Sequence, residues 1–146
     1  MNETLKGKWS DHSFRHDPIV VKNGNKDAEV EGNPDLLIPW SPPGVLDVNT
    51  DEQGEVTGTL TFPAVPGVAL KITGHISPAA DEKHLACLEI TGEMATQKGL
   101  SVNKLKGFFI ESDHVVGTIV NLANDLGQHP QPVGTEGPFV LFPAKA

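Results

Sequence analysis

Residues 55–122 read EVTGTLTFPAVPGVALKITGHISPAADEKHLACLEITGEMATQKGLSVNKLKGFFIESDHVVGTIVNL. One motif recurs in this stretch: an apolar residue, any residue, glycine, any residue and a second apolar residue. Its five copies are Val56-Gly58-Leu60, Ile72-Gly74-Ile76, Ile90-Gly92-Met94, Leu105-Gly107-Phe109 and Val115-Gly117-Ile119, and a sixth near the start is Leu5-Gly7-Trp9. Because side chains alternate along a strand, the two apolar residues and the glycine share one strand face. Glycines at the same place in six strands predict a small, tightly coiled closed sheet, in which some inward side chains must be absent. Room for a ligand is the rarer explanation.

The whole chain of 146 residues favours a single all-β domain, residues 1–146. Its 15 glycines and 12 prolines fit many strands and turns, and no segment has a sustained helical period. Alternation and turn residues predict eight strands, at residues 4–11, 45–50, 55–62, 68–77, 84–94, 101–110, 114–122 and 138–142. Most are joined in order by short turns, which predicts an eight-stranded antiparallel up-and-down barrel, since closure removes exposed strand edges.

Residues 12–44 form a long insertion between the first two predicted strands. More than 30 residues is too long for an ordinary connection. Its apolar pieces, Ile19-Val20-Val21 and Leu36 to Trp40, predict a structured flap that packs over the barrel mouth or the outer face and could include a short strand.

The net charge and the single cysteine exclude several classes of protein. A net charge of −8 argues against a nucleic-acid partner or an anionic membrane surface. No apolar run is long enough to span a membrane, and MNETLKGKW lacks the apolar core of a signal peptide. Cys87 is the one cysteine, so no internal disulfide can form. We therefore expect a cytoplasmic location.

Several segments resemble avidin and streptavidin: LKGKW at residues 5–9, DEQGEVTGTLTF at 51–62, and the later TGH, TGE and KGF. The resemblance implies a calycin-type barrel over most of the chain, and Gly-x-Trp in the first strand is also typical of lipocalins. It does not imply biotin binding. Avidin-like sites use a tyrosine just after Thr-Gly-Thr, where this chain has Leu60, and tryptophans in later strands, whereas none follows Trp40. Asp11 stands near the position that binds the ureido oxygen of biotin. An ionised carboxylate has no hydrogen to donate to that oxygen, so it suits this role poorly.

The meander order places both long loops, 12–44 and 123–137, at one end of the barrel, which we call the loop end. Polar inward residues converge there over apolar ones, the usual form of a small-molecule site. The sequence therefore predicts a non-enzymatic barrel that binds a small, partly apolar molecule at the loop end. The predicted ligand-binding residues are Trp9, Asp11, Leu60, Phe62, Met94, Asn103, Phe109 and Asn121. In the alternative explanation, the two asparagines bond loop backbone and Asp11 caps a turn.

Other chemistry has weaker support. No catalytic residue and no cofactor are predicted, but a dry Asp11 with a raised pKa could act as acid or base in an isomerase or hydratase. His12 and His16 share a strand face and suggest a weak alternative metal site, although nothing fixes a third ligand. Arg15, between Asp11 and Asp17, predicts a surface charge cluster instead. A third possibility is an assembly module with a filled barrel.

The outward positions of the strands at 101–110 and 114–122 are unusually apolar. They are Phe108, Ile110, Val116, Val120 and Leu122. An apolar outer stripe of this size needs a cover, either the flap or another subunit. We expect a homo-oligomer that uses this face, most commonly a dimer.

Overall fold

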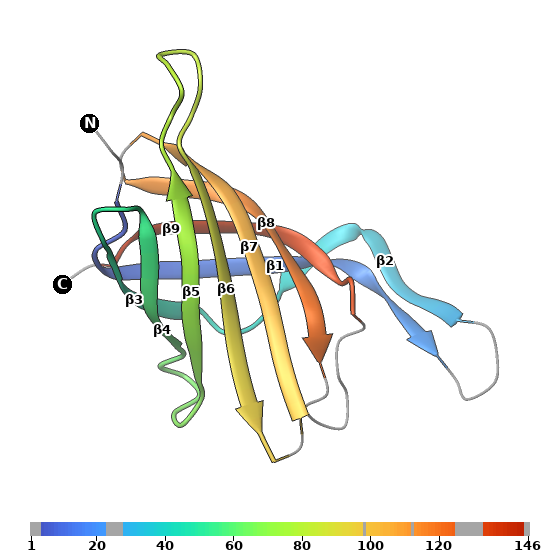
Figure 1. Ribbon diagram of the computed structural model, residues 1–146. Coiled ribbons are helices and arrows are strands. Elements are labelled where there is room, and N and C mark those ends of the chain that lie inside the picture. The colour runs from blue at the N-terminus through green and yellow to red at the C-terminus, as the bar shows by residue number, and fades with distance from the viewer. Residues whose placement is uncertain (1–3, 23–27, 98, 112, 125–132, 145–146) are drawn as a thin grey trace.

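The computed structural model describes residues 4–22, 28–97, 99–111, 113–124 and 133–144, and for 17–22, 28–35 and 96 the backbone alone. It contains nine strands: β1 Gly7–Lys22, β2 Ala28–Pro39, β3 Gly44–Thr50, β4 Glu55–Thr61, β5 Ala69–Ser77, β6 Cys87–Thr96, β7 Gly99–Ile110, β8 His114–Asn124 and β9 Glu136–Pro143 (Figure 1). Within these ranges, no helix has the length and apolar character needed to cross a membrane. The cytoplasmic location stays a prediction.

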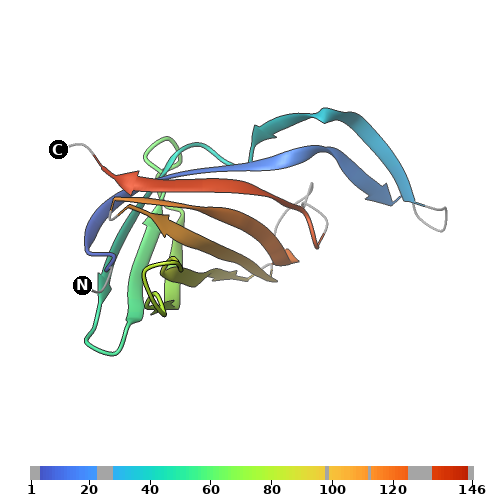
Figure 2. The same ribbon diagram turned by 90° about the horizontal axis from the view of Figure 1, so that it is seen from above.

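Eight of the strands close into an antiparallel barrel. Strands β3 to β9 pair in chain order, and the first half of β1 pairs with both β3 and β9. Asp11, for example, lies opposite Gly44 on one side and Leu141 on the other. Figure 2 shows this closure from above. The fold class predicted from the sequence, an eight-stranded up-and-down barrel, is therefore confirmed.

The ninth strand belongs to the long insertion. β1 does not end near Asp11 but continues to Lys22, and its second half pairs with β2, from Phe14 opposite Pro39 to Lys22 opposite Ala28. The resulting hairpin extends away from the barrel (Figures 1 and 2). The first strand was thus predicted too short, because residues 10–17 are polar on both faces of the strand apart from Phe14. Whether the segment also acts as a flap stays a prediction.

The recurring glycines lie where neighbouring strands approach most closely. A Cβ built at Gly117 would lie 2.1 Å from the carbonyl oxygen of Lys106 and 2.4 Å from Cα of Gly107. One built at Gly58 would lie 2.1 Å from the carbonyl oxygen of Asp47. The obstacle is the backbone of the next strand, so tight coiling of the sheet requires glycine at these sites.

Two copies of the motif have other causes. At Gly92 an added Cβ would meet only side-chain atoms, Cδ2 of Leu70 at 3.2 Å and Cδ1 of Ile72 at 3.3 Å. Gly7 is exposed, has a φ of 78° and has nothing within 4 Å of a built Cβ. The prediction that Gly7 faces inward with the other five is therefore wrong. It serves the positive φ at the start of β1, which few other residues adopt.

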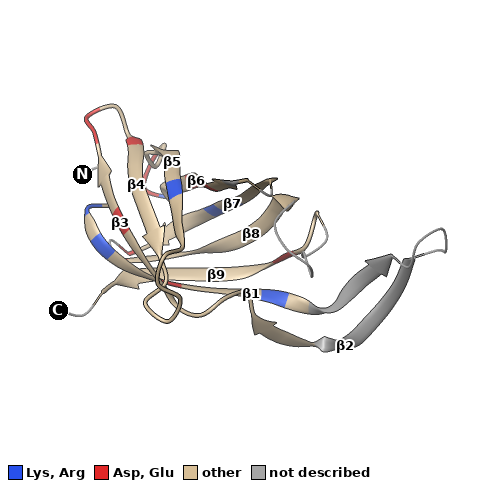
Figure 3. Ribbon diagram, turned by 90° about the horizontal axis from the view of Figure 1, so that it is seen from below, with Lys and Arg blue, Asp and Glu red and all other residues tan. Residues whose placement is uncertain are grey.

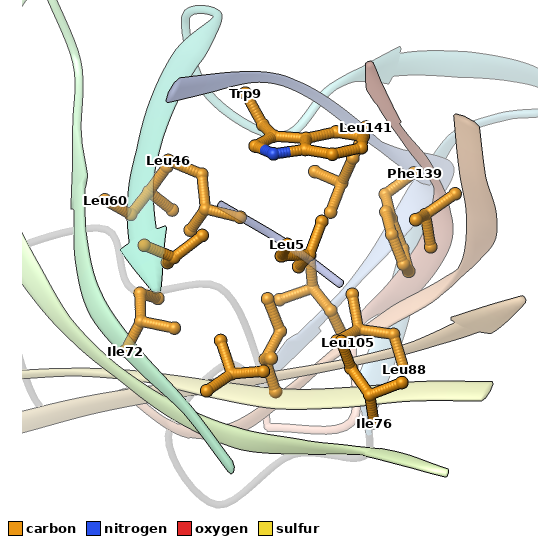
Figure 4. Close-up of a cluster of buried hydrophobic side chains, with 14 of the residues drawn as sticks. Leu5, Trp9, Leu46, Leu60, Ile72, Ile76, Leu88, Leu105, Phe139 and Leu141 are labelled. Atoms are coloured by element: carbon orange, nitrogen blue, oxygen red, sulfur yellow. The ribbon is translucent and has the colours of Figure 1, made fainter. Parts of the chain in front are cut away.

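The core extends to the end of the barrel away from the hairpin, which we call the closed end. Leu5 is fully buried there, and Thr50 Oγ1 bonds both its backbone groups, accepting from N–H at 3.0 Å and donating to the carbonyl at 2.8 Å. Figure 4 shows Leu5 inside the barrel, with Trp9 against Leu141 above it. These side chains anchor the chain before β1 and close one end of the cylinder.

Acidic residues gather at the closed end. The β3–β4 turn, red in Figure 3, lies far from the hairpin. Each of the three closed-end turns has two exposed carboxylates, at Asp51 and Glu52, Asp81 and Glu82, and Glu111 and Asp113. In contrast, the loop-end connections at residues 40–43 and 62–68 contain no charged residue. The insertion at residues 17–35 carries five more acids, Asp17, Asp27, Glu29, Glu31 and Asp35, so the negative charge of the chain is divided between the closed-end turns and that segment.

Candidate functional site

A small cavity lies inside the barrel at the loop end, beneath Trp40 and Ser41. Its volume is about 30 Å³. It is lined by Asp11, Ser13, Trp40, Ser41, Leu46, Leu60, Phe62, Leu70, Ile72, Ile90, Gly92, Asn103, Leu105, Ile119 and Leu141. The space suits about two water molecules and is far below the several hundred Å³ of a usual ligand site. The barrel is neither completely filled nor open to a large ligand.

A wider hollow of about 510 Å³ lies at the closed end, between Thr4, Lys6 and the β3–β4 turn. Most of the residues that line it are exposed polar residues of the turn and the strand ends, and few are buried. Such a hollow offers a ligand little desolvated surface, so we consider the small cavity as the site.

Asp11 and Ser13 supply the polar side of the cavity from β1. Asp11 is only 5% exposed, and Ser13 Oγ donates a hydrogen bond of 2.7 Å to its Oδ1. Burial raises the pKa of the Asp11 carboxyl, while the Ser13 hydrogen bond and the nearby His12 oppose that shift. The carboxyl therefore takes up a proton more readily than an exposed aspartate.

Asn103 and Asn121 face each other across β7 and β8, just after a register shift between Val102 and Asn103. Asn121 Nδ2 donates to Asn103 Oδ1 at 2.9 Å and also to the carbonyls of Ala123 and Val102, at 3.2 and 3.4 Å. Asn103 lines the cavity, whereas Asn121 lies behind it. The side chain of Asn121 thus bonds strand backbone rather than the loop backbone of the alternative explanation, and it holds Asn103 in place.

The predicted ligand-binding residues separate into three groups. Four line the cavity: Asp11, Leu60, Phe62 and Asn103. Asn121 contacts the cavity only through Asn103. The other three, Trp9, Met94 and Phe109, belong to or pack against the apolar core and do not line the cavity.

Sequence reasoning missed Ser13, Trp40 and Ser41. Ser13 continues the inward alternation of Trp9 and Asp11, so a longer first strand would have found it. Trp40 lies directly opposite Ser13, to whose carbonyl it donates a backbone hydrogen bond of 2.9 Å. A large aromatic residue within the proline-rich end of the insertion was the available signal for that contact.

The two histidines considered as metal ligands lie on the outer face of β1. The ring of His12 stacks on Phe142, with 5.3 Å between centroids and 19° between planes, and His16 is exposed. Four residues of extended strand separate the two histidines by about 13 Å, too far to share one ion readily. Among the described residues, no three potential ligands gather around a common point. The geometry does not support the metal alternative.

Arg15 differs from its prediction as well. It is partly buried, and its Nε and Nη1 atoms are shielded from solvent. Asp11 is buried in the cavity wall, and the side chain of Asp17 lies outside the described residues. Arg15 is therefore not part of an exposed charge cluster with Asp11. The reason is its place on the inward face of β1.

The outer face of β7 and β8 is apolar and is exposed in the part of the chain that the structure describes. Phe108, Ile110, Val116 and Leu122 are 40–48% exposed, and Val120 is partly buried. Phe108 lies opposite Val116 across the two strands. We refer to these five residues as the outer stripe.

Comparison with known proteins adds no further guide, because no family model, curated protein or solved structure matches this chain. The site is therefore interpreted from its own geometry.

Proposed function

We propose that the barrel binds a small, partly apolar molecule at the loop end and catalyses no reaction. The observation that carries this proposal is the partly open cavity with apolar walls and polar groups from separate elements: Asp11 and Ser13 on β1, Ser41 before β3, and Asn103 on β7. Apolar walls with a few placed polar groups are typical of small-molecule sites.

The cover of the cavity gives a ligand a way in. Trp40 and Phe62 line the cavity and pack against the core, but both are only partly buried. A ligand larger than two water molecules has to displace one of them. We infer that binding moves these aromatic rings outward while the walls below stay in place, since close-packed cores tolerate little deformation.

The proposal extends to the fold family only by analogy. The closed eight-stranded sheet is compatible with an avidin-like or lipocalin-like calycin barrel. We also propose a cytoplasmic location, on the sequence argument alone. A fold shared by many functions does not identify a ligand, so the residues of the cavity remain the argument.

Filling the cavity tests the proposal. Gly92→Ala adds a methyl group to the cavity wall, where only the flexible ends of Leu70 and Ile72 must shift by a few tenths of an ångström. Hexan-1-ol serves as an uncharged probe, with binding followed by two-dimensional NMR of labelled protein. The wild type should show saturable shifts at cavity residues, and Gly92→Ala should weaken binding about tenfold.

Thr91→Ala is the matched control, because Thr91 lies next to Gly92 on the outward face of β6. It should bind hexan-1-ol as the wild type does. The proposal fails if hexan-1-ol does not bind the wild type, if its shifts map to the closed end, or if Gly92→Ala binds equally well.

The enzyme alternative rests on Asp11, whose raised pKa suits a general acid or base. In that reading the same cavity would hold a substrate for an isomerase or hydratase. Loss of turnover in Asp11→Asn, with the barrel still folded, would favour this alternative over simple binding.

We also propose that the outer stripe is a homo-oligomer interface. Its support is the exposure of four large apolar residues on two adjacent strands. Phe108→Glu should elute as a smaller species than the wild type in size-exclusion chromatography. Thr118→Glu, which adds the same charge at an exposed polar position on β8, should elute unchanged. Equal elution of the folded Phe108→Glu and wild-type proteins would contradict this interface.

A further inference from the structure

The Arg15 side chain is the clearest unsatisfied group of the molecule. Its Nε and Nη1 atoms are both buried, and neither finds a hydrogen-bond partner in the part of the chain that the structure describes. A guanidinium stays protonated at every pH at which proteins fold, so it cannot lose its charge to avoid the cost of burial. Two buried donors without a hydrogen-bond partner are destabilising, which points to a partner from outside the chain.

The position of Arg15 links it to the cavity. Side chains of β1 alternate, so Arg15 shares the inward face of the strand with Asp11 and Ser13, both of which line the cavity. Two residues of extended strand place Arg15 about 7 Å beyond Ser13, toward the loop end. A group bound by Arg15 would therefore lie above the cavity, within reach of a ligand whose body enters it.

The residues beside Arg15 on the two neighbouring strands offer its guanidinium no polar partner. On β9 the neighbour is Gly137, where a built Cβ would lie only 2.6 Å from Cα of Arg15 and 2.0 Å from the carbonyl oxygen of Phe14. No side chain can occupy that position. On the other side Arg15 lies opposite Ile38 of β2, which offers an apolar contact and no competing carboxylate.

The charge of the missing partner follows from its surroundings. A guanidinium presents parallel N–H donors that match the two oxygens of a carboxylate. A single cation balances one negative charge, which favours a carboxylate over a doubly charged phosphate. The six exposed carboxylates of the closed-end turns lie at the opposite end of the barrel and repel an anion at Arg15 little. Residues 17–35 carry five further acids against two lysines, which disfavours a doubly charged anion more than a singly charged one.

We propose that Arg15 binds the carboxylate of the ligand, and that the ligand is a small aliphatic carboxylic acid whose apolar body enters the cavity. This inference rests on the proposed function and adds the chemical class of the ligand. The acid head lies at Arg15, and its chain passes Trp40 and Phe62 toward the walls at Leu60 and Ile119. Asp11 and Asn103, lower in the cavity, would meet any polar group farther along that chain.

A pair of ligands with the same body separates the inference from the proposed function. Hexanoate and hexan-1-ol differ mainly in the charged head, and both can be titrated by NMR at pH 7. We expect the wild type to bind hexanoate at least tenfold more tightly than hexan-1-ol, as a charge-assisted bidentate pair requires. Arg15→Gln should remove that preference and leave the affinity for hexan-1-ol unchanged.

Three variants and one further ligand complete the test. Arg15→Lys should retain part of the preference, because it keeps the charge and loses the paired donors. Lys106→Gln removes an exposed cation from the outer face and should retain all of it. Arg15→Met, without ligand, should melt at a higher temperature than the wild type, because it removes the two unpaired donors.

The outcomes are distinct. If hexan-1-ol binds in the cavity but hexanoate binds no better, or if Arg15→Gln keeps the preference, the inference is wrong and the proposed function stands. If hexyl phosphate binds more tightly than hexanoate through Arg15, the assignment of a carboxylate is wrong. If neither six-carbon probe binds the wild type, both proposals fall together.

Discussion

The two ends of the barrel differ in how completely their buried polar groups are paired. At the closed end the backbone of Leu5 is bonded on both sides by the hydroxyl of Thr50, within an apolar core. At the loop end Asp11 is buried with a raised pKa, and Arg15 has two buried nitrogens without a partner among the described residues. The first arrangement stabilises the fold, and the second costs stability.

This difference indicates that the residues of the loop end were selected for a function rather than for stability. A sequence selected for folding alone would place apolar residues at the inward positions of Asp11, Ser13 and Arg15, as it does at Trp9. Functional sites are the usual places where local rules of packing and pairing are broken. Substitutions at the closed end should therefore mainly lower stability, and substitutions at the loop end should mainly change ligand binding.

The largest effect is expected from Leu5→Ala at the closed end. The substitution leaves a cavity around a fully buried position, while the backbone bonds to Thr50 remain possible. It should lower the free energy of unfolding by about 2–5 kcal/mol, as measured by urea denaturation. Hexan-1-ol binding to the folded fraction should not change. A loss below about 1 kcal/mol would show that the closed end is not the stable part of the barrel.

Phe62→Ala at the loop end should cost less, about 1–2 kcal/mol, because the side chain is only partly buried. The same change enlarges the cavity by removing part of its cover. Hexan-1-ol should therefore bind the variant more tightly than it binds the wild type, in the NMR titration. Weaker binding by a folded variant would mean that Phe62 holds the ligand rather than covers the cavity.

Asp11→Asn should have a smaller effect whose size depends on pH. Burial raises the pKa of Asp11 above its ordinary value of 3.8, so the folded protein binds a proton more tightly than the unfolded chain does. The contribution of this carboxyl to stability is fully present below pH 3.8 and is lost as the pH rises through the raised pKa. Asparagine does not titrate, so the variant should gain stability relative to the wild type between acid and neutral pH.

Urea denaturation of both proteins at pH 3.5, 5 and 7 measures this difference. The gain should grow from the first value to the last, and Ser13→Ala provides a comparison because it removes the hydrogen bond that opposes the shift. A difference independent of pH would show that the Asp11 carboxyl is not desolvated at the loop end.

The sequence was most informative about the closed sheet. The strand expected at residues 55–62 is β4, Glu55–Thr61, and the glycine motif located the close approaches of the coiled backbone correctly at Gly58 and Gly117. Regular alternation of apolar and other residues made this possible. Alternation holds in these strands because their inward face meets only the core.

The part of β1 that follows Asp11 was missed for the opposite reason. Asp11 and the inward residues beyond it, Ser13 and Arg15, are polar, so the hydrophobic pattern stops although the strand continues. The end of the first strand was placed at Asp11, and the site residues beyond it were lost with it. Asn103 was found because the residues that follow it in β7 keep a regular apolar alternation.

The smallest effect is expected on the outer wall, which belongs to neither end. Lys104 forms an exposed ion pair with Glu89 across β6 and β7, and this pair lowers the pKa of Glu89. A carboxylate with a lowered pKa adds stability above its ordinary pKa and loses it in acid, but solvent screening makes exposed pairs weak. Lys104→Ala should therefore leave the urea midpoint at pH 7 nearly unchanged. It should also leave the affinities for hexan-1-ol and hexanoate at wild-type values. Its neighbour Asn103 lines the cavity, but Lys104 does not. A clear loss of hexanoate binding would mean that general attraction by surface cations, rather than Arg15, produces the preference for acids. The unpaired nitrogens of Arg15 would then not explain why the loop end differs from the closed end.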